Sequence, residues 1–354
     1  MGTGASREEP RTGQQELDYF DFPKNSQLQK QSTSYSRPKL QSLAHLHRSS
    51  IPTKSFTYQE LAKATDDFSD HNSLGWDGCC YVYRGKLSNT EVMIKDFDGC
   101  DDTGFLSEIL VIGRTNHPNI VKMVGYCVGA GIRMLVLEIV PNNTLDFHLH
   151  GGETPSINWE NRMKIALGVA KGLVYLHEDC DPTIVHRNIK LSNVLLDFDF
   201  EPKIAGFNFA TQCTVSRTAT RSGCMFPDYC SDNRHSDKSD VFSFGFILLE
   251  LITGKKPFFS AVDQSPHVAT WIMPPLKNAL NKCDYTALVD PTLGNQYSKE
   301  EMGRMIHCAA ACIYKLERNG PQMKEIVQVL EGDMSMKLIW QHEKDKHYIR
   351  TLLC

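Results

Sequence analysis

The sequence predicts an α+β fold in which a β-rich part precedes a helical part. Apolar and polar residues alternate from Cys80 to Arg84 and from Glu91 to Phe97, as they do in paired strands. Met134 to Val140 is an apolar run of the length of a buried strand. Further along, Asn161 to His177 carries apolar residues on one helical face, and Asp240 to Ile252 is apolar nearly all round. These two segments indicate an amphipathic helix and a fully buried helix.

Length and composition indicate an ordinary folded protein. The chain has 354 residues, a formal charge of −4 and 41% hydrophobic residues, enough for one large domain or two small ones. The longest apolar run, Val241 to Ile252, is too short to cross a bilayer. The 12 cysteines lack the spacing of a disulfide framework, and no apolar signal segment opens the chain, so we expect a reduced intracellular protein.

Residues 1–55 are predicted to be disordered, because they are rich in Gln, Ser, Pro and charge and have no apolar period. They open with MGTGAS, which fits the pattern for myristoylation of Gly2. Between Phe22 and Ser55 there are six Lys or Arg residues and no Asp or Glu, and such a stretch attracts anionic lipid headgroups. One acyl chain anchors weakly, so the pairing predicts membrane attachment. The alternatives are a chance match and a solvated linker.

A short helix is expected to lead into the β-rich part. Leu61, Ala64 and Phe68 fall at helical spacing, so they would share one face of that helix. The strand pair that follows is expected to turn at Ser88–Thr90, between its two alternating segments. A helix and a hairpin would then open the folded part of the chain.

The stretch that carries the most information about function is Val185 to Ala210. It contains HRNIKLSN at His186–Asn193 and GFN at Gly206–Asn208. The two motifs resemble the H-R-D-x-x-x-x-N and D-F-G patterns of the catalytic and magnesium loops of eukaryotic protein kinases. The resemblance implies a two-lobed fold, with a small β-rich lobe and a large helical lobe. It also implies ATP-dependent phosphorylation of serine or threonine with magnesium.

Both carboxylates of these motifs are replaced. In the family, the carboxylate at the position of Asn188 accepts the proton of the substrate hydroxyl, and an amide is not a useful base at neutral pH. The carboxylate at the position of Gly206 holds magnesium, and glycine has no side chain. Lys190 and Asn193 are retained, but one neutral oxygen from Asn193 holds a hard cation poorly. A rescue by the amide oxygen of Asn208 is left open.

The family's glycine-rich loop, G-x-G-x-x-G-x-V, is altered as well. It reads GWDGCCYV, in which Gly75 and Val82 match while Asp77 and Cys80 stand at the second and third glycines. Those glycines let backbone N–H groups approach phosphates closely. Asp77 instead brings a negative charge to the place where a phosphate should lie.

The strand lysine of the family and its helix partner are present as Lys95 in VMIK and Glu108 in FLSEILVIGR. The resemblance implies that Lys95 pairs with Glu108 and with nucleotide phosphates. The alternative is a structural ion pair that holds the small lobe together. Met93 stands where the family usually has alanine, and we expect it to crowd the adenine pocket. If a nucleotide binds, the resemblance assigns it to Gly75, Val82, Lys95, Glu108, Glu138 and Leu195.

The activation segment, residues 206–228, also departs from the family. Its A-P-E motif reads Phe226–Asp228, and Gly320 replaces the arginine that should pair with the acid, so we expect a remodelled substrate segment. Arg187 is retained, and in active relatives such an arginine pairs with an activation-segment phosphate. The alternative role for Arg187 is to hold the loop through backbone carbonyls. Candidate phosphorylation sites are Thr214, Ser216, Thr218 and Thr220.

The resemblance runs from Phe56 to Gly332. The phrases VPNNTLDFHLHG, ALGVAKGLVYLHEDC and KSDVFSFGFILLELITGKKP resemble plant receptor-like kinases, and among them the proline-rich extensin-like receptor kinases. Those have an extracellular part and a membrane helix, which we do not expect here, so the chain resembles a receptor-like cytoplasmic kinase. We expect an N-terminal segment at 1–55, lobes at 56–141 and 142–332, and a tail at 333–354 with a short helix.

We interpret the chain as a membrane-associated pseudokinase, a scaffold or allosteric partner in receptor kinase signalling at the inner face of the plasma membrane. Expected partners are active receptor-like kinases or their substrates and an anionic membrane surface, with no nucleic acid. ATP binding is left open, and magnesium binding is not expected. Two other interpretations stand beside this one: an active serine/threonine kinase of weak activity, and a decayed gene product without a stable role.

Overall fold

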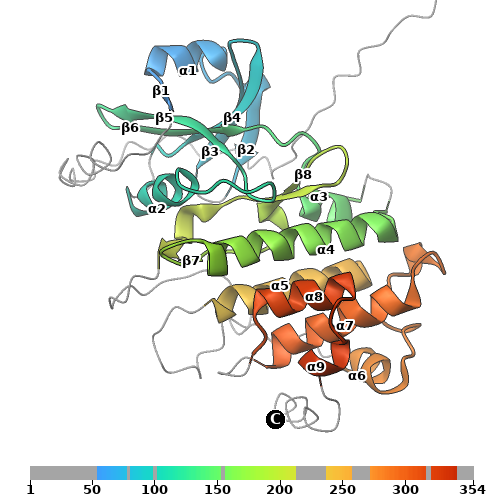
Figure 1. Cartoon of the computed structure of the whole chain (residues 1–354). Helices are drawn as coiled ribbons and strands as arrows, with labels where there is room; N and C mark the ends of the chain where they lie inside the picture. Colours follow the sequence, from blue (N-terminus) through green and yellow to red (C-terminus); the bar gives the residue numbers. More distant parts are fainter. Residues whose placement is uncertain are drawn as a thin grey trace, which may run out of the picture.

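The computed structural model describes residues 54–77, 80–98, 102–152, 156–212, 237–256, 272–315 and 320–340. These residues form a small lobe built around a β-sheet and a large lobe built of helices, as Figure 1 shows. The order of elements along the chain places the sheet first and the long helices after it. The two-lobed α+β fold expected from the sequence is therefore confirmed.

A six-stranded sheet forms the small lobe. Its strands are β1 (Lys54–Ser55), β2 (Ser73–Trp76), β3 (Tyr81–Leu87), β4 (Thr90–Asp96), β5 (Met123–Gly129) and β6 (Ile132–Glu138). They lie in the order β1-β5-β6-β4-β3-β2, with β1 parallel to β5 and the other neighbours antiparallel. The expected strand pair is present as β3 and β4, with positive φ angles at Ser88 and Asn89 in the turn between them. The expected buried strand is β6, whereas β5 was not anticipated.

Alternation along β4 separates the two faces of this sheet, because successive side chains of a strand point to opposite sides. Val92 and Ile94 belong to a hydrophobic cluster with Leu61, on the face covered by helix α1 (Tyr58–Ala64). Met93 belongs to the large cluster that continues into the other lobe. Lys95 shares the face of Met93, so the strand itself directs the lysine toward the candidate site.

Helix α1 is shorter than its sequence pattern suggests. It begins with a capping box, in which Glu60 N donates to Thr57 Oγ1 and Thr57 N donates to Glu60 Oε2. It ends at Ala64, so the expected helical position of Phe68 is wrong. Phe68 lies in a left-handed turn and packs edge-on against Tyr83 of β3, with ring centroids 5.3 Å apart. Contact with the sheet therefore overrides helical spacing at this position.

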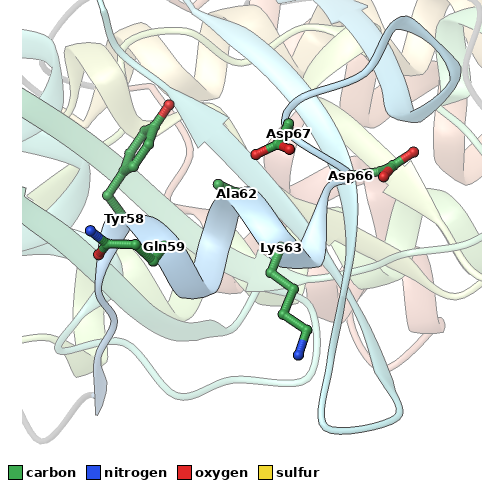
Figure 2. A pocket seen from close by; sticks show the side chains of 6 residues that line it. All are labelled: Tyr58, Gln59, Ala62, Lys63, Asp66 and Asp67. Atoms are coloured by element: carbon green, nitrogen blue, oxygen red, sulfur yellow. The ribbon is translucent and has the colours of Figure 1, made fainter.

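The turn after α1 borders a shallow pocket on the outer side of the small lobe. Three consecutive residues there, Asp66, Asp67 and Phe68, have φ angles of 53°, 54° and 54°. L-residues with side chains rarely adopt this conformation, which costs roughly 1–2 kcal/mol per residue. Figure 2 shows the pocket, which has a volume of about 370 Å³. It is lined by Tyr58, Gln59, Ala62, Lys63, Asp66 and Asp67, and by none of the residues assigned to a nucleotide.

Helices α4 and α5 form the centre of the large lobe. The predicted amphipathic helix is α4 (Trp159–Val174), which is capped by the side chain of Asn158 and ends in a π-helical turn at Tyr175–Asp179. The predicted buried helix is α5 (Lys238–Thr253), which ends at Gly254 with a φ of 64°. Around them lie α3 (Leu145–His150), α6 (Met273–Lys282), α7 (Lys299–Tyr314), α8 (Met323–Glu331) and α9 (Met336–Ile339). Both predicted helices are confirmed.

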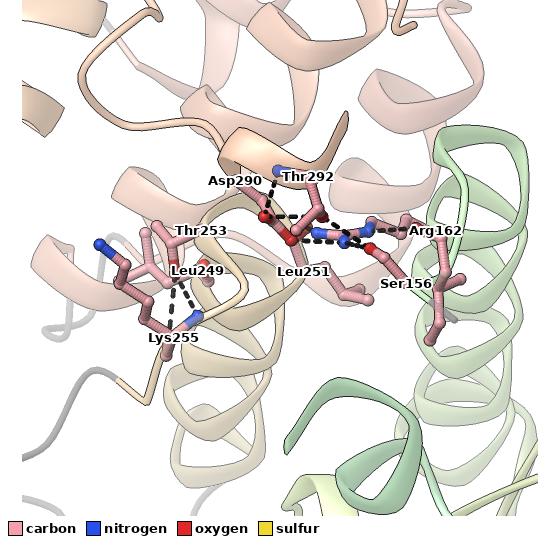
Figure 3. A network of polar contacts seen from close by, with 9 residues as sticks. Ser156, Arg162, Leu249, Leu251, Thr253, Lys255, Asp290 and Thr292 are labelled. Atoms are coloured by element: carbon pink, nitrogen blue, oxygen red, sulfur yellow. Dashed lines mark hydrogen bonds and ion pairs between the residues drawn. The ribbon is translucent and has the colours of Figure 1, made fainter. Parts of the chain in front are cut away.

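A buried ion cluster joins α4 to the chain beyond α5. Figure 3 shows Arg162 of α4 donating to Asp290 Oδ2 at 2.6 Å. The same guanidinium donates to the carbonyls of Ile157 and Leu251 and to the hydroxyl of Ser156. Four hydrogen bonds from Arg162 end on acceptors in three segments of the large lobe, so the cluster holds these segments together.

The tail expected at residues 333–354 begins as part of the large lobe. Helix α9 supplies the expected short helix, and it packs against α7 and α8. Trp340, which follows it, is buried. Across the parts of the chain that the structure describes, no helix combines the length and the apolarity needed to cross a membrane.

Candidate active site

Lys95 and Glu108 are the most buried charged pair of the candidate site. Lys95 is 4% exposed, and its Nζ donates to Oε1 and Oε2 of Glu108 at 2.8 and 2.9 Å. Glu108 comes from α2 (Asp102–Ile112) and is fully buried. The two side chains paired from the sequence are thus in contact, and they tie α2 to the sheet.

Asp77 is a second carboxylate on the same lysine. Its Oδ2 lies 2.9 Å from Lys95 Nζ. Its other oxygen, Oδ1, accepts from the N–H of Cys80 at 2.9 Å, while the N–H of Asp77 donates to the Cys80 carbonyl. The residues at the second and third glycine positions therefore build one tight turn that aims a carboxylate inward.

The charges of this cluster are strongly coupled. Burial disfavours the ammonium of Lys95, but Asp77 and Glu108 outweigh burial and hold the pKa of Lys95 well above its usual range. Burial raises the pKa of Glu108 against the opposing effect of Lys95, and Asp77 adds to the rise. Two carboxylates thus face one ammonium, which leaves the site with surplus negative charge.

Two apolar residues assigned to a bound nucleotide, and the methionine expected to crowd its pocket, are almost inaccessible. Val82, Leu195 and Met93 are 1%, 4% and 5% exposed and belong to one hydrophobic cluster. Glu138 is committed elsewhere, because its Oε1 accepts from the N–H of Lys122 and from Nζ of Lys203. Gly75 lies on β2 with a φ of 110°. The nucleotide roles of these residues stay predictions, as does crowding by Met93.

Short strand pairs of the large lobe frame the catalytic loop. The loop His186–Asn193 lies between β7 (Ile184–Val185) and β8 (Val194–Leu196). The segment at Gly206 lies between β9 (Pro202–Ile204) and β10 (Thr211–Gln212). Because β7 pairs with β10 and β8 pairs with β9, both motifs are held side by side.

Asp240 of α5 fixes the start of the catalytic loop, a role that the sequence reasoning missed. Its carboxylate accepts from the backbone N–H groups of His186 and Arg187, both at 2.7 Å, and contacts Nε2 of His177 at 2.9 Å. Burial opposes its ionisation, but the hydrogen bond and charge of His177 keep the pKa of Asp240 below its usual value. The sequence did contain a signal for this role, because Asp240 is an acidic residue in a helix that is otherwise apolar nearly all round.

The positions of the two lost carboxylates both adjoin Asn193. Asn193 Nδ2 donates to the carbonyl of Asn188 at 2.7 Å, and the carbonyl of Asn193 accepts from Ala205. A Cβ added at Gly206, whose φ is 80°, would lie 2.6 Å from Asn193 Oδ1. Lys190 precedes Asn193 and is half-buried. The loops thus keep the geometry of a catalytic site, although positions 188 and 206 lack the acids of the family.

Magnesium and nucleotide phosphates are the groups that the resemblance implies for this site. Mg²⁺ requires octahedral oxygen ligands and is usually held by carboxylates, whereas the motif positions offer the neutral amide oxygen of Asn193. In the described ranges, no group of three or more His, Cys, Asp or Glu could hold a metal ion. Phosphates would have to share Lys95 with two carboxylates. The residues present fit neither group as the family holds it.

Several predicted residues lie outside the described residues. These are Gly2, the basic stretch up to residue 53, the hydroxyl residues Thr214, Ser216, Thr218 and Thr220, and the altered A-P-E motif at Phe226–Asp228. The end of the segment predicted to be disordered is described, and there the prediction is wrong, because Lys54–Ser55 form strand β1 against β5. Near Gly320, where an arginine was expected, Lys238 Nζ donates to the carbonyls of Gly320 and Pro321 at 3.0 and 2.8 Å. This lysine, 82 residues away in the chain, was not anticipated.

Comparison with known proteins identifies relatives of this arrangement. The family described as protein tyrosine and serine/threonine kinase matches residues 70–330. The chain is 46% identical over 294 residues to the proline-rich receptor-like protein kinase PERK1 of Arabidopsis thaliana, covering 79% of this chain and 45% of PERK1. It is 47% identical over 291 residues to PERK5, covering 79% and 43%, and 44% identical over 296 residues to PERK3, covering 80% and 58%. The chain thus spans about half the length of these relatives.

Proposed function

Because the chain belongs to the family of protein tyrosine and serine/threonine kinases, we propose that it is a pseudokinase that signals through its surface instead of transferring phosphate. The observation that carries this proposal is the pair of substitutions at Asn188 and Gly206 inside an otherwise ordered catalytic frame. A positioned base contributes roughly 10²- to 10⁴-fold to such a rate, and the lost metal ligand adds to the deficit.

The rest of the frame supports a retained role for the fold. Asp240 still holds the catalytic loop, and Lys95 still pairs with Glu108. Buried polar contacts that are satisfied in this way make a fold rigid and specific, as a scaffold requires. We therefore favour a scaffold or allosteric partner over a decayed product.

A weakly active serine/threonine kinase is the second candidate. It is favoured by the intact Lys95–Glu108 pair and by the presence of Lys190 and Asn193. This candidate needs another proton acceptor and another metal ligand. Asn208, in the turn Phe207–Phe209, could supply an amide oxygen as the metal ligand. In our proposal magnesium does not bind at this site, and any ATP binding is weak.

Receptor kinase signalling at the inner face of the plasma membrane is the proposed setting. The named relatives are receptor-like kinases, and the chain carries a myristoylation pattern at Gly2 and a basic stretch before residue 55. Residues 1–55 would bind the membrane, while the lobes at 56–141 and 142–332 would contact receptor-like kinases or their substrates. No role is assigned to residues 333–354.

Regulation by phosphorylation is part of the proposal. Arg187 is held at its backbone by Asp240 and has a φ of 66°, so its position does not depend on catalysis. A phosphate on Thr214, Ser216, Thr218 or Thr220 carries about −1.5 to −2 charge and would bind an arginine strongly. Incubation with an active receptor-like kinase, followed by peptide mass spectrometry and protease protection, tests this. Unchanged protection in the phosphorylated Arg187→Ala variant would argue for the structural role of Arg187.

The decisive experiment is a phosphotransfer assay of the purified chain with radiolabelled ATP, magnesium and a generic substrate. We expect no incorporation above that of a Lys95→Ala control. Incorporation that disappears in the control would establish the weak kinase instead. Separately, a Gly2→Ala chain fused to a fluorescent protein should become diffuse in plant cells, and unchanged membrane localisation would exclude myristoylation as the anchor.

A further inference from the structure

We infer that the carboxylate of Asp77 acts as a built-in substitute for a nucleotide phosphate, which holds Lys95, Glu108 and helix α2 in place when no nucleotide is bound. The inference concerns ligand affinity and conformation and goes beyond the proposed loss of phosphotransfer. It would apply equally to an inactive chain and to a weak enzyme.

The first support is the saturation of Lys95. An ammonium has three N–H donors. Three carboxylate oxygens lie within 2.9 Å of Nζ, two from Glu108 and one from Asp77. Lysine–phosphate bonds have this same length and charge character. A nucleotide phosphate could therefore bind Lys95 only by displacing one of these three oxygens, and Asp77 is the carboxylate that stands at the position of a phosphate-binding glycine.

The second support is the rigidity with which Asp77 is presented. Its Oδ1 is held by the Cys80 N–H, and its own N–H is bonded to the Cys80 carbonyl, so both ends of the turn are fixed. The Cys80 side chain is fully buried in the core of the small lobe. The two residues that replace glycines therefore act as a unit, in which Cys80 anchors the turn and Asp77 occupies the lysine.

The third support is the balance of charge. The cluster already holds two carboxylates for one ammonium, and the pKa of Glu108 is raised, chiefly by burial, with Asp77 adding to the rise. A triphosphate would add further negative charge to this site. Removal of Asp77 would leave the ion pair of Lys95 and Glu108, whose net charge is zero. This is the state that can accept a phosphate.

Two substitutions of Asp77 separate its roles. Asp77→Asn keeps an oxygen for the Cys80 N–H and removes the charge next to Lys95. Asp77→Gly restores the family's residue. Glu91→Gln is the matched control, since Glu91 is exposed on β4, the strand of Lys95, and the substitution makes the same change in charge. All variants are made in the full chain.

ATP binding is measured by thermal shift and calorimetry, in EDTA and in magnesium. Wild type and Glu91→Gln should show no ATP-dependent stabilisation at millimolar ATP. Either Asp77 variant should bind at least roughly tenfold more tightly, since like charges placed together in a site disfavour association. Because Met93 can block adenine independently, Met93→Ala and the double variant Asp77→Gly/Met93→Ala are included. The double variant should bind more tightly than Met93→Ala alone.

The position of α2 is read by hydrogen exchange of residues 102–112. Without ATP, we expect faster exchange in Asp77→Asn than in wild type, and recovery of protection when ATP is added. Glu91→Gln should exchange like wild type. This readout involves no turnover, so it is distinguishable from the phosphotransfer assay.

Three results would overturn the inference. The first is clear ATP-dependent stabilisation of the wild-type chain at millimolar ATP, which is measured without any variant. The second is equal ATP affinity of Met93→Ala and the double variant. The third is unchanged exchange of α2 in Asp77→Asn. Wild-type binding and its exchange pattern need no variant to fold, so the inference stays testable even if both Asp77 variants are unstable.

Discussion

Two buried ion clusters, one in each lobe, hold their cations in different ways. In the large lobe, Arg162 meets two backbone carbonyls, a hydroxyl and one carboxylate, all fixed by the fold. In the small lobe, the ammonium of Lys95 is bonded to two carboxylates, one on α2 and one on the turn that follows β2, and it lies 5.4 Å from the centroid of the Phe97 ring. The first arrangement is a permanent joint, whereas the second can exchange one anion for another. The partners of each cation thus distinguish Arg162, which stabilises the fold, from Lys95, which we infer could bind a ligand.

Removal of the permanent joint should have the largest effect. Arg162→Ala would leave Asp290 as an uncompensated carboxylate in the large lobe, and breaking a buried pair in this way costs about 3–5 kcal/mol. Urea unfolding of the full chain measures the change in the free energy of unfolding. A loss below about 1 kcal/mol would mean that Arg162 is not the joint described.

Acid should weaken the large-lobe cluster. Burial opposes the ionisation of Asp290, but hydrogen bonds from Thr292 and Arg162 place its pKa below the usual value. An unfolded Asp takes up a proton near pH 3.9, while the native one stays ionised to lower pH. The stabilisation is therefore complete above about pH 3.9 and is lost as the pH falls toward the native pKa. Stability profiles of wild type and Asp290→Asn should converge in acid, and parallel profiles would contradict this.

The small-lobe cluster should tolerate the loss of one carboxylate. In Glu108→Gln, Lys95 keeps Asp77, so we expect a loss of about 1.5–3 kcal/mol, the range of hydrogen bonds to charged groups. The pH dependence has the opposite sign to that of Asp290. Because the native pKa of Glu108 is raised, wild type gains stability as the pH falls from that pKa toward about 4.3, and the Gln variant lacks this gain. If the free energy of unfolding of the wild type shows no such gain at lower pH, the cluster does not carry the surplus negative charge described above.

An exposed ion pair provides the smallest effect and the control for both clusters. Lys171 Nζ lies 2.7 Å from Glu331 Oε1, but the two side chains are 48% and 33% exposed. Such pairs contribute about 0–1 kcal/mol because solvent screens them. Lys171→Ala should shift the urea midpoint little, and an effect as large as that of Arg162→Ala would remove the basis for the comparison.

The fold was largely predictable because its signals are local. Alternation fixed β3 and β4, and apolar helical faces fixed α4 and α5. Strand β5 was missed because Gly125 and Gly129 interrupt its alternation. The end of α1 was misjudged because the position of Phe68 is set by a ring on another strand, which helical spacing cannot report.

The candidate site was predictable in its residues but not in their contacts. The motifs identified Lys95, Glu108 and Asp77, and they showed which acids are missing. The ion pair between Asp77 and Lys95 depends on the backbone path of a turn, which has no signature in single residues. Likewise, the bonds from Lys238 to the carbonyls at Gly320 and Pro321 follow from tertiary packing across 82 and 83 positions of the chain.

The left-handed geometry of Gly206 limits the side chains that this position can take. With a φ of 80° and Asn193 Oδ1 at 2.6 Å from an added Cβ, this position accepts no side chain without movement. Asn193 is also the side chain that donates to the carbonyl of Asn188. A Gly206→Asp substitution would therefore require Asn193 to shift, so the repair of this loop needs more than the return of one acid.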